Sequence, residues 1–427
     1  MIEKPTRKRF TILALVFGSV VINYLDRSNI SIAAPLMKTD LGLDSVRMGY
    51  VFSAFSITYA LLQVPGGAIV DRVNPRKLYP FILFWWSLAT MVQGFLQTFG
   101  GFLSTRAAVG VFEAPAYPMN NRIVTAWFPE HERASAIASY TSGQFIGLAF
   151  LSPLLVLIQD WVGWRGLFIT SGLIGIVWSL VWYVFYRSPE QHTGLNQAER
   201  SLIAPDNPNT QNGGMVTKVA LFQWSDLHYP FSYRKLWGLY IGQFCLNTLF
   251  AFFLTWFPTY LVEYRGLSFV KTGWLSSIPF LAAFFGVLLS GFLSDYLVRT
   301  GHSNAFARKT PILTGMLLSM SILFANYTND TSLIIFFLSL AFFGNGLASI
   351  TWVFISLMAP RQLIGLVGGV FNFIGGLAAV VTPIVIGYLV KAGDFQPVLI
   401  YIAVVTAVGF CSYLFLVGRV ERIVIES

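Results

Sequence analysis

Twelve long apolar segments constrain the fold of this chain more than any other feature of its sequence. Each approaches the roughly 20 consecutive apolar residues that an α-helix needs to cross the hydrocarbon core of a bilayer. They cover residues 10–36, 47–70, 78–98, 100–121, 135–159, 166–186, 236–258, 272–293, 310–327, 331–356, 361–390 and 397–418. Only 11% of the 427 residues are charged, whereas a soluble domain has about 25%. We therefore predict an all-α, multi-pass membrane protein with 12 transmembrane helices.

The lysine and arginine residues are unevenly distributed between the loops. If both termini are cytoplasmic, the cytoplasmic segments hold 20 of the 28 Lys and Arg residues, and the loops on the other side hold six. Because the cytoplasmic loops of membrane proteins carry an excess of positive charge, this distribution predicts cytoplasmic termini. It also accounts for the net charge of +9, so we expect no nucleic-acid partner.

Neither the cysteines nor the histidines indicate a cofactor site. Cys245 and Cys411 both lie in apolar segments and are expected to be small buried apolar residues, while the four histidines fall in loops. No nucleotide-binding G-x-x-x-x-G-K-[ST] loop occurs, and no soluble region is large enough for catalysis. We therefore expect no cofactor, no metal site and no enzyme activity.

The second part of the chain repeats features of the first. The stretch "GGAIVDRVNPRKLYP" follows the second apolar segment, and "GFLSDYLVRTGHSNAFARKTP" follows the eighth. In this comparison Gly67 and Asp71 correspond to Gly291 and Asp295. The repeat indicates that the twelve segments form two related sets of six.

A polar stretch separates the two sets. Residues 187–235, between the sixth and seventh segments, are rich in Asn, Pro, Gly and Gln. We predict two pseudo-symmetric six-helix halves, residues 1–186 and 236–427, joined by a cytoplasmic linker. In transporters built from such repeats, the substrate site lies between the halves near the middle of the bilayer.

Four ionisable residues interrupt the apolar segments of the first half: Asp26 and Arg27 in the first, Arg106 and Glu113 in the fourth. A charge at the bilayer centre costs at least about 2.5–3.5 kcal/mol, so such residues face a partner or a watery cavity. Adjacent helical residues point about 100° apart, so Asp26 and Arg27 need separate partners. Gly110 shares a stripe with Arg106 and Glu113 and allows another helix to approach. Two interpretations remain: structural ion pairs between helices, or a site in which Arg27 binds an anion and the carboxyl groups exchange protons.

Several motifs of the chain resemble those of a known transporter family. The loop after the second segment matches G-x-x-x-D-(R/K)-x-x-x-R-(R/K), the signature of the major facilitator superfamily, and the loop after the eighth matches it at Gly291 and Asp295 before an insertion. The chain is similar to the anion:cation symporter branch of that superfamily over nearly all the segments. The stretches that carry this similarity, besides the loops, are "NYLDRSNIS", "GYVFSAFSITYALLQVPGG", "RAAVGVFEAPAYPMNNRIVTAWFPEHERASA" and "FGNGLASITW".

This resemblance implies a monomeric, proton-coupled symporter of the bacterial cytoplasmic (inner) membrane, with protons as the coupling ion. It would import a small sugar-acid monoanion, D-galactonate foremost, by alternating access through the lipid bilayer. The seventh segment has no basic residue in its core, which favours monoacids over diacids. A symporter for hexuronate, glucarate or sialic acid and an uncoupled facilitator remain as alternatives.

The resemblance also implies roles for particular residues. Asp26 and Glu113 would be the protonation sites, with Arg106 beside them, and Arg27 would hold the substrate carboxylate. The residues that would line the substrate site are Tyr24, Arg27, Tyr59, Gln144, Ser349, Thr351, Trp352 and Asn372. The alternative is that the neutral polar residues only join helices by hydrogen bonds.

The tenth segment raises a question of geometry. It carries a polar stripe at spacings of four, three and four residues: Asn345, Ser349, Trp352 and Ser356. Thr351 lies off this stripe, so its assignment requires Gly344 and Gly346 to distort the helix.

The repeated loops are expected to act in the conformational change. The residues concerned are Gly67, Asp71, Arg72, Arg76 and Asp295. Charges there can pair across the interface between the halves and hold one conformation closed to the cytoplasm. The alternative is that they only set the topology.

Overall fold

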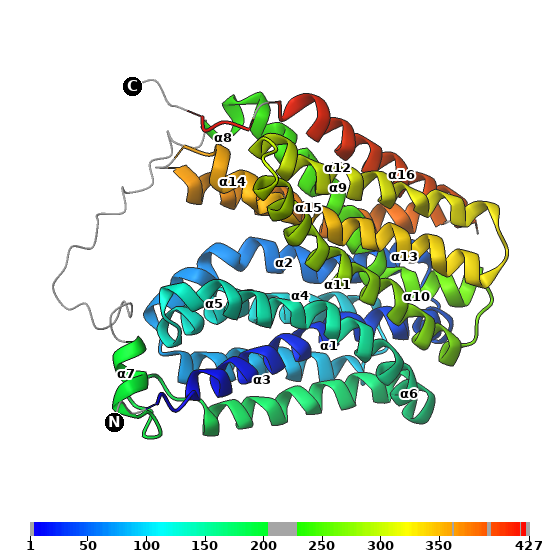
Figure 1. Cartoon of the computed structure of the whole chain (residues 1–427). Coiled ribbons are helices and arrows are strands. Elements are labelled where there is room, and N and C mark those ends of the chain that lie inside the picture. The colour runs from blue at the N-terminus through cyan, green and yellow to red at the C-terminus, as the bar shows by residue number, and fades with distance from the viewer. Residues whose placement is uncertain (1–3, 204–228, 361–362, 391–393, 419, 424–427) are drawn as a thin grey trace.

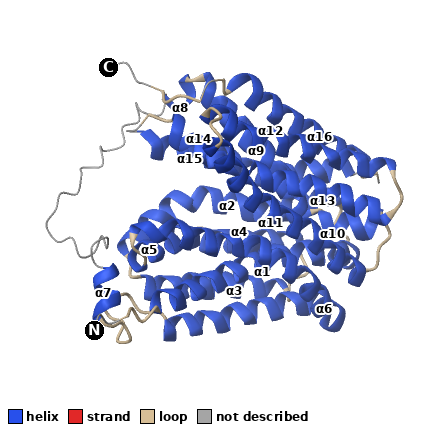
Figure 2. Ribbon diagram, in the orientation of Figure 1, coloured by secondary structure: helices blue, strands red, loops and turns tan. Residues whose placement is uncertain are grey.

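The fold is entirely helical within the described residues (Figure 2). The structure is a computed structural model, and it describes residues 4–203, 229–360, 363–390, 394–418 and 420–423. The first half forms the lower part of the molecule in Figure 1. Its helices are α1 (Lys8–Leu41), α2 (Ser45–Arg72), α3 (Pro75–Gln93), α4 (Phe99–Glu113), α5 (Ala116–Trp127) and α6 (Glu130–Phe185).

The second half forms the upper part of the molecule in Figure 1. Its helices are α9 (Arg234–Thr255), α10 (Phe257–Thr259), α11 (Phe269–Arg299), α12 (Asn304–Ser319), α13 (Thr331–Leu347), α14 (Trp352–Met358), α15 (Ile364–Leu389) and α16 (Gln396–Cys411). Tighter or wider helical turns extend four of them, at Tyr260–Tyr264, Met320–Tyr327, Ala348–Thr351 and Ser412–Leu416. Two short helices belong to the predicted linker: α7 (Gln197–Ile203) and α8 (Tyr229–Ser232). The predicted linker residues between them, 204–228, lie outside the described ranges.

All twelve predicted crossings have a helical counterpart, although several are built from more than one element. The long helix α6 contains two crossings, because Gly163 adopts φ 72° and turns the chain between two helical arms. The fourth crossing is divided into α4 and α5 around Pro115. Among the described residues, eight helices, the double α6 among them, are long and apolar enough to span a membrane; the remaining crossings are α2, α3 and the pair α4–α5.

The first part of the linker is fixed to the N-terminus through Glu199 of α7, which is buried. Its carboxylate accepts hydrogen bonds from the Thr6 hydroxyl, from the backbone N–H of Lys8 at 3.0 Å and from Nη1 of Arg9 at 3.1 Å. Burial by itself would raise the pKa of Glu199, but these hydrogen bonds outweigh it and hold that pKa below its ordinary value. We call the side of the bundle that carries the N-terminus and α7 the linker side, and the opposite side the distal side.

The two halves touch on the distal side. Gly49 of α2 lies so close to α15 that a Cβ atom at this position would be 2.5 Å from the Pro383 carbonyl oxygen. One turn further along α2, the Ser53 hydroxyl donates a hydrogen bond to the Val380 carbonyl oxygen at 2.7 Å. The glycine at position 49 therefore lets the backbones of α2 and α15 come together.

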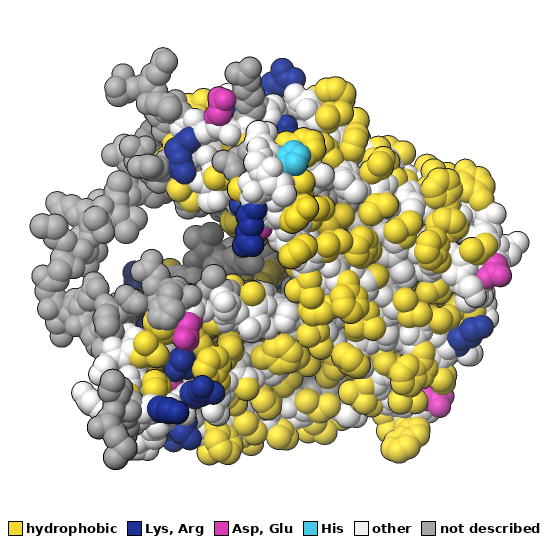
Figure 3. Space-filling view, viewed as in Figure 1, with side chains coloured by type: hydrophobic (Ala, Val, Ile, Leu, Met, Phe, Trp, Pro, Cys, Tyr) yellow, Lys and Arg dark blue, Asp and Glu magenta, His cyan; other side chains and the backbone are white. Residues whose placement is uncertain are grey.

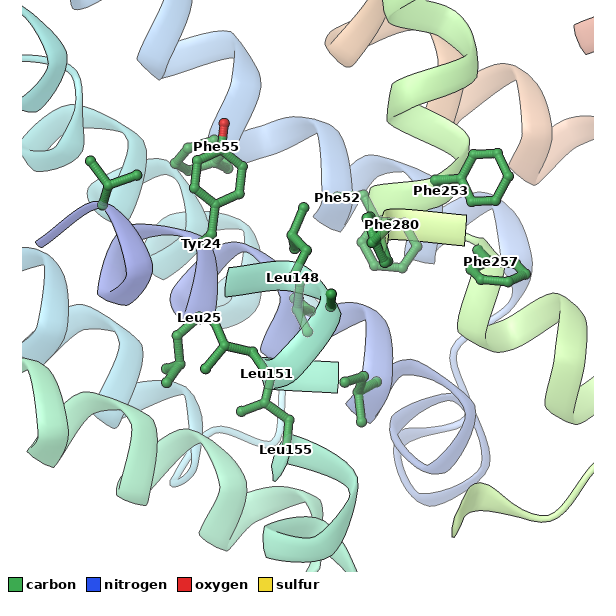
Figure 4. Close-up of a cluster of buried hydrophobic side chains, with 14 of the residues drawn as sticks. Tyr24, Leu25, Phe52, Phe55, Leu148, Leu151, Leu155, Phe253, Phe257 and Phe280 are labelled. Carbon is green, nitrogen blue, oxygen red and sulfur yellow. The ribbon is translucent and has the colours of Figure 1, made fainter. Parts of the chain in front are cut away.

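Aromatic and charged side chains complete this distal contact. The ring of Phe52, from the first half, lies 5.4 Å from the Trp256 ring and beside Phe280 (Figure 4). The Lys38 ammonium group donates to the Glu263 carboxylate at 2.6 Å, which joins the halves by an ion pair. On the linker side the surface is hollowed between the halves (Figure 3). The structure is therefore closed distally and open toward the linker side.

Candidate functional site

The centre of the first half holds an arginine–glutamate pair. Nε of Arg27 donates to Oε1 of Glu113 at 2.5 Å, and Nη2 of Arg27 contacts the same oxygen. Glu113 is fully buried. The guanidinium group also lies against the rings of Tyr24 and Phe55, each at 5.0 Å, and Tyr59 at 4.8 Å; Figure 4 shows Tyr24 and Phe55 side by side. Three aromatic faces and one carboxylate therefore stabilise the cation.

Close helix packing brings the Arg27 partner into place. A Cβ atom on Gly110 would lie 2.4 Å from the Phe55 carbonyl oxygen, so α4 packs directly on the backbone of α2. The helix α4 ends at Glu113, and Pro115 begins the turn into α5. The close approach expected at Gly110 is confirmed, and it places the last residue of α4 next to Arg27 of α1.

Asp26 points to a different part of the first half. Its Oδ2 accepts a hydrogen bond from Nε1 of Trp86 on α3 at 3.1 Å. Nη1 of Arg106 donates to the backbone oxygen of Asp26 at 3.3 Å, not to its carboxyl group. The Asp26 side chain is fully buried, and its Oδ1 atom has no hydrogen-bond partner within the described residues. As the helical geometry required, Asp26 and Arg27 have separate partners.

Trp86 is a partner that the sequence analysis missed. An indole in the apolar segment 78–98 is indistinguishable from a core or lipid-facing side chain when only the sequence is read. The one available signal was its donor group, because a buried Trp N–H usually finds an acceptor. Trp86 is fully buried.

Polar residues from both halves also meet on the linker side of the distal contact. Nδ2 of Asn372 on α15 donates to Oε1 of Gln63 on α2 at 3.1 Å, across the interface. Both lie toward the linker side from the distal contact at Ser53 and Val380. Tyr59 of the Arg27 cluster lies one turn before Gln63 on α2. The Arg27 cluster is therefore about one helical turn from this contact between the halves.

Other neutral residues expected at the site are distributed around this cluster. The Tyr24 hydroxyl donates to Oε1 of Gln144 at 2.9 Å. Trp352 is 50% exposed, and its ring lies 5.1 Å from that of Phe371. Ser349 is exposed in the turn just before it.

Thr351 occupies a distorted part of the tenth crossing. The helix α13 ends at Leu347, and the turn Ala348–Thr351 is a tighter 3-10 helix before α14 begins. A Cβ atom on Gly346 would lie 2.2 Å from the Ala283 carbonyl oxygen, which shows how closely this crossing packs on α11. Thr351 is buried, and its hydroxyl donates to Oε1 of Gln243 at 2.9 Å. The expected distortion is present, and it directs Thr351 to α9.

The loop residues assigned to the conformational change lie at the linker ends of the helices. The guanidinium group of Arg76 lies 5.4 Å from the Tyr183 ring of the same half, and Asp295 accepts from Nη1 of Arg308 at 2.9 Å, also within one half. Arg72 is exposed, a Cβ atom on Gly67 would touch nothing within 4 Å, and the side chain of Asp71 lies outside the described residues. In this open conformation, the described pairs stay within their halves.

Comparisons with known proteins agree with this architecture. The family model described as Major Facilitator Superfamily matches residues 16–375. The D-galactonate transporter of Escherichia coli O6:H1 is 49% identical over 98% of both chains. The probable galactarate/D-glucarate transporter of Escherichia coli K12 is 42% identical over 99% of this chain and 96% of its own.

A solved structure has a similar fold. The bacterial homologue of the human lysosomal transporter Spinster, in an inward-facing and occupied conformation, has a TM-score of 0.78 at 17% identity, with 96% of each chain covered. Within the described ranges no group of three or more His, Cys, Asp and Glu residues could hold a metal ion. The family match over most of the chain, the similar relatives and the helical fold show that this chain belongs to the major facilitator superfamily.

Proposed function

We propose that this protein is a proton-coupled symporter that imports a sugar-acid monoanion, D-galactonate in the first place, by alternating access. The names of the 49% and 42% identical relatives support a sugar-acid substrate. The distribution of Lys and Arg supports a cytoplasmic linker side in the bacterial inner membrane. The hollow then faces the cytoplasm. The halves, 1–186 and 236–427, rock about the site, and the protein acts as a monomer.

The observation that carries the proposal is the pair between Arg27 and Glu113. A substrate carboxylate has the same shape and charge as the Glu113 side chain, so the two compete for one guanidinium group. When Glu113 takes up a proton, it loses its hold on Arg27, and the substrate anion replaces it. When Glu113 releases the proton to the cytoplasm, it recovers Arg27 and displaces the substrate.

The neutral residues would select the remainder of the substrate. Hydroxyl groups of a sugar acid need both donors and acceptors, which the surrounding phenol, amide, indole and hydroxyl groups supply. Those that we assign to the substrate are Tyr24, Tyr59, Gln144, Ser349, Trp352 and Asn372, with Thr351 acting through Gln243. Asp26 is the second protonation site, with Arg106 close to it. Gly67, Asp71, Arg72, Arg76 and Asp295 would act when the linker side closes.

Counterflow in proteoliposomes tests the substrate class. Vesicles preloaded with galactonate, gluconate, a hexuronate, glucarate or sialic acid are assayed for exchange of labelled galactonate. We expect galactonate to exchange best and the diacid glucarate to exchange poorly, because Arg27, the guanidinium group that we assign to the substrate, holds one carboxylate. Exchange of glucarate but not of any monoacid would refute the monoanion assignment.

Arg27→Ala tests the anion site itself. We expect at least a roughly 30-fold loss of galactonate affinity, since removal of one member of a buried charged pair costs about 2–5 kcal/mol. Normal affinity in this variant, measured by thermal shift or isothermal titration in detergent, would place the anion site elsewhere.

A further inference from the structure

Several buried polar groups of α1 and α3, which we call the row, lie at successive heights of the first half, away from the Arg27 pair. Asn29 of α1 and Thr90 and Gln93 of α3 are fully buried. Both side-chain polar atoms of Asn29, Oγ1 of Thr90 and Oε1 of Gln93 have no hydrogen-bond partner within the described residues. Buried polar groups that lack a protein partner are as a rule satisfied by internal water. The proposed competition between Glu113 and the substrate for Arg27 does not involve these groups.

The register of α1 and α3 places this row on the distal side of Asp26. The two helices run in the same direction, and the hydrogen bond from Trp86 to Asp26 sets them level. Asn29 lies three residues beyond Asp26, which is about 4.5 Å along the helix. Thr90 and Gln93 lie one and two turns beyond Trp86, and the Thr90 side chain faces Asp26.

The row ends close to the distal surface. Gln93 is the last residue of α3. The next residue, Gly94, lies so close to α6 that a Cβ atom there would be 2.6 Å from the Arg165 carbonyl oxygen. Arg165 forms an ion pair with Asp40, and both side chains are more than a third exposed. Unpartnered polar groups thus occur from Asp26 almost to the distal face.

On the other side of Asp26, the row reaches Glu113. Asn23 lies one turn toward the linker side on α1, it is buried, and neither of its side-chain polar atoms has a partner within the described residues. Its side chain faces Glu113, whose Oε2 atom is likewise without a partner in the described part of the chain. Asn23 therefore lies next to Glu113 and about one helical turn from Asp26.

We propose that Asn29, Thr90 and Gln93 hold a chain of water molecules that delivers protons from the distal side to Asp26, and that Asn23 holds a water molecule through which they pass on to Glu113. This inference rests on the proposed symport. The route lies inside the first half and is separate from the hollow that admits the substrate. Each step breaks one O–H bond and forms the next one, so the transfer needs no further reactant.

The pair between Arg27 and Glu113 opposes a proton leak along this route, because a proton that passes from the row to Glu113 has to break the pair. Oε1 of Glu113 is held by Arg27, while Oε2 has no hydrogen-bond partner within the described residues. Glu113 is the carboxyl group at which the row approaches Arg27, and a protonated Glu113 releases Arg27. The substrate carboxylate must then replace Glu113 at the arginine. The geometry therefore links proton delivery to substrate binding.

Two volume-conserving variants, Thr90→Val and Gln93→Leu, test the route in proteoliposomes. Galactonate uptake driven by a pH gradient is compared with galactonate counterflow, which needs no net proton movement. We expect a roughly tenfold lower rate of gradient-driven uptake, with counterflow unchanged. Replacing H₂O by D₂O should slow the variants more than the wild-type protein, because proton delivery becomes their slowest step. Thr90→Ser, which keeps the hydroxyl group, should behave as wild type.

A matched substitution controls for loss of a buried hydroxyl group as such. Thr406 of α16 is buried in the second half and donates to the Ile402 carbonyl oxygen, so Thr406→Val should leave gradient-driven uptake unchanged. An equal loss in Thr406→Val, or wild-type uptake in Thr90→Val and Gln93→Leu, would overturn the route. Loss of counterflow in Thr90→Val would also overturn it, since Thr90 would then be structural. If Asp26→Asn keeps full gradient-driven uptake, the proposed coupling itself fails.

Discussion

Gly49→Ala should trap the transporter with its distal side open. Gly49 lies within α2 and has ordinary helical geometry, so alanine favours this helix by about 1 kcal/mol. The new Cβ atom would nevertheless lie 2.5 Å from the Pro383 carbonyl oxygen and 3.1 Å from the Ile384 Cα atom. Ordinary contact begins at 3.4 Å, so α2 and α15 would have to separate by about 0.9 Å. Because the atoms it meets belong to the backbone, no side chain can rotate away.

The cost falls only on the conformation in which α2 and α15 touch. Overpacking of a tight contact costs about 1–3 kcal/mol. A shift of 1–3 kcal/mol changes the ratio of the two conformations about 5- to 150-fold. Gly49→Ala should therefore fold normally, favour the distally open conformation and transport slowly.

Cysteine accessibility measures this shift. Ser53→Cys is introduced into a protein whose Cys245 and Cys411 are replaced by alanine, and its reaction with a membrane-impermeant maleimide is followed from the distal side. We expect the reaction to be roughly tenfold faster with Gly49→Ala. Gly100→Ala is the control, because a Cβ atom at this helical position touches nothing within 4 Å. Equal rates in the wild-type, Gly49→Ala and Gly100→Ala backgrounds would refute the reasoning.

Three further results are expected. Glu113→Gln should keep galactonate counterflow but lose uphill uptake, and full proton-driven accumulation in this variant would remove Glu113 from the coupling. Glu263→Gln removes the partly exposed ion pair with Lys38, so the distal contact should weaken by at most about 1 kcal/mol. In the same maleimide assay, the reaction rate should change by about fivefold or less. The pKa of Glu199 in the folded protein is below its ordinary value. The Glu199 contacts therefore stabilise the fold at pH values above the ordinary glutamate pKa of about 4.3, and this stabilisation is lost as the pH falls through the lower pKa of the folded state. A melting temperature that falls as steeply over this pH range in Glu199→Gln as in the wild type would contradict that assignment.

Much of the fold could be predicted because lipid imposes a simple rule on the sequence. A chain that crosses a bilayer must satisfy its backbone polar groups internally, so each long apolar segment becomes a helix. The ends of the helices were harder to predict, because a helix can continue outside the apolar layer. The helix α1 runs from Lys8 to Leu41, beyond the predicted 10–36. The distortion at Thr351 was predictable because closely packed glycines precede it.

The partners of the buried charges could not be predicted with the same certainty. That Asp26 and Arg27 need separate partners follows from helical geometry, but the choice of Trp86 depends on how α1 and α3 are packed. The polar residues Asn29, Thr90 and Gln93 were overlooked because single polar residues in apolar segments carry no periodic signal. The pair between Lys38 and Glu263 joins residues 225 positions apart, and no local pattern relates them.

The pair between Arg27 and Glu113 explains why transport would be coupled. To reorient, the halves must close over the site and bury Arg27. With Glu113 ionised, the pair is already neutral, so the unloaded carrier can close. With Glu113 protonated and no substrate, Arg27 would be buried without a counter-charge, which costs several kcal/mol. A substrate carboxylate removes this cost, so the halves reorient with a protonated Glu113 only when the anion is bound. The same reasoning shows why Glu113→Gln should permit exchange alone: it can close with substrate bound, but it cannot return without it.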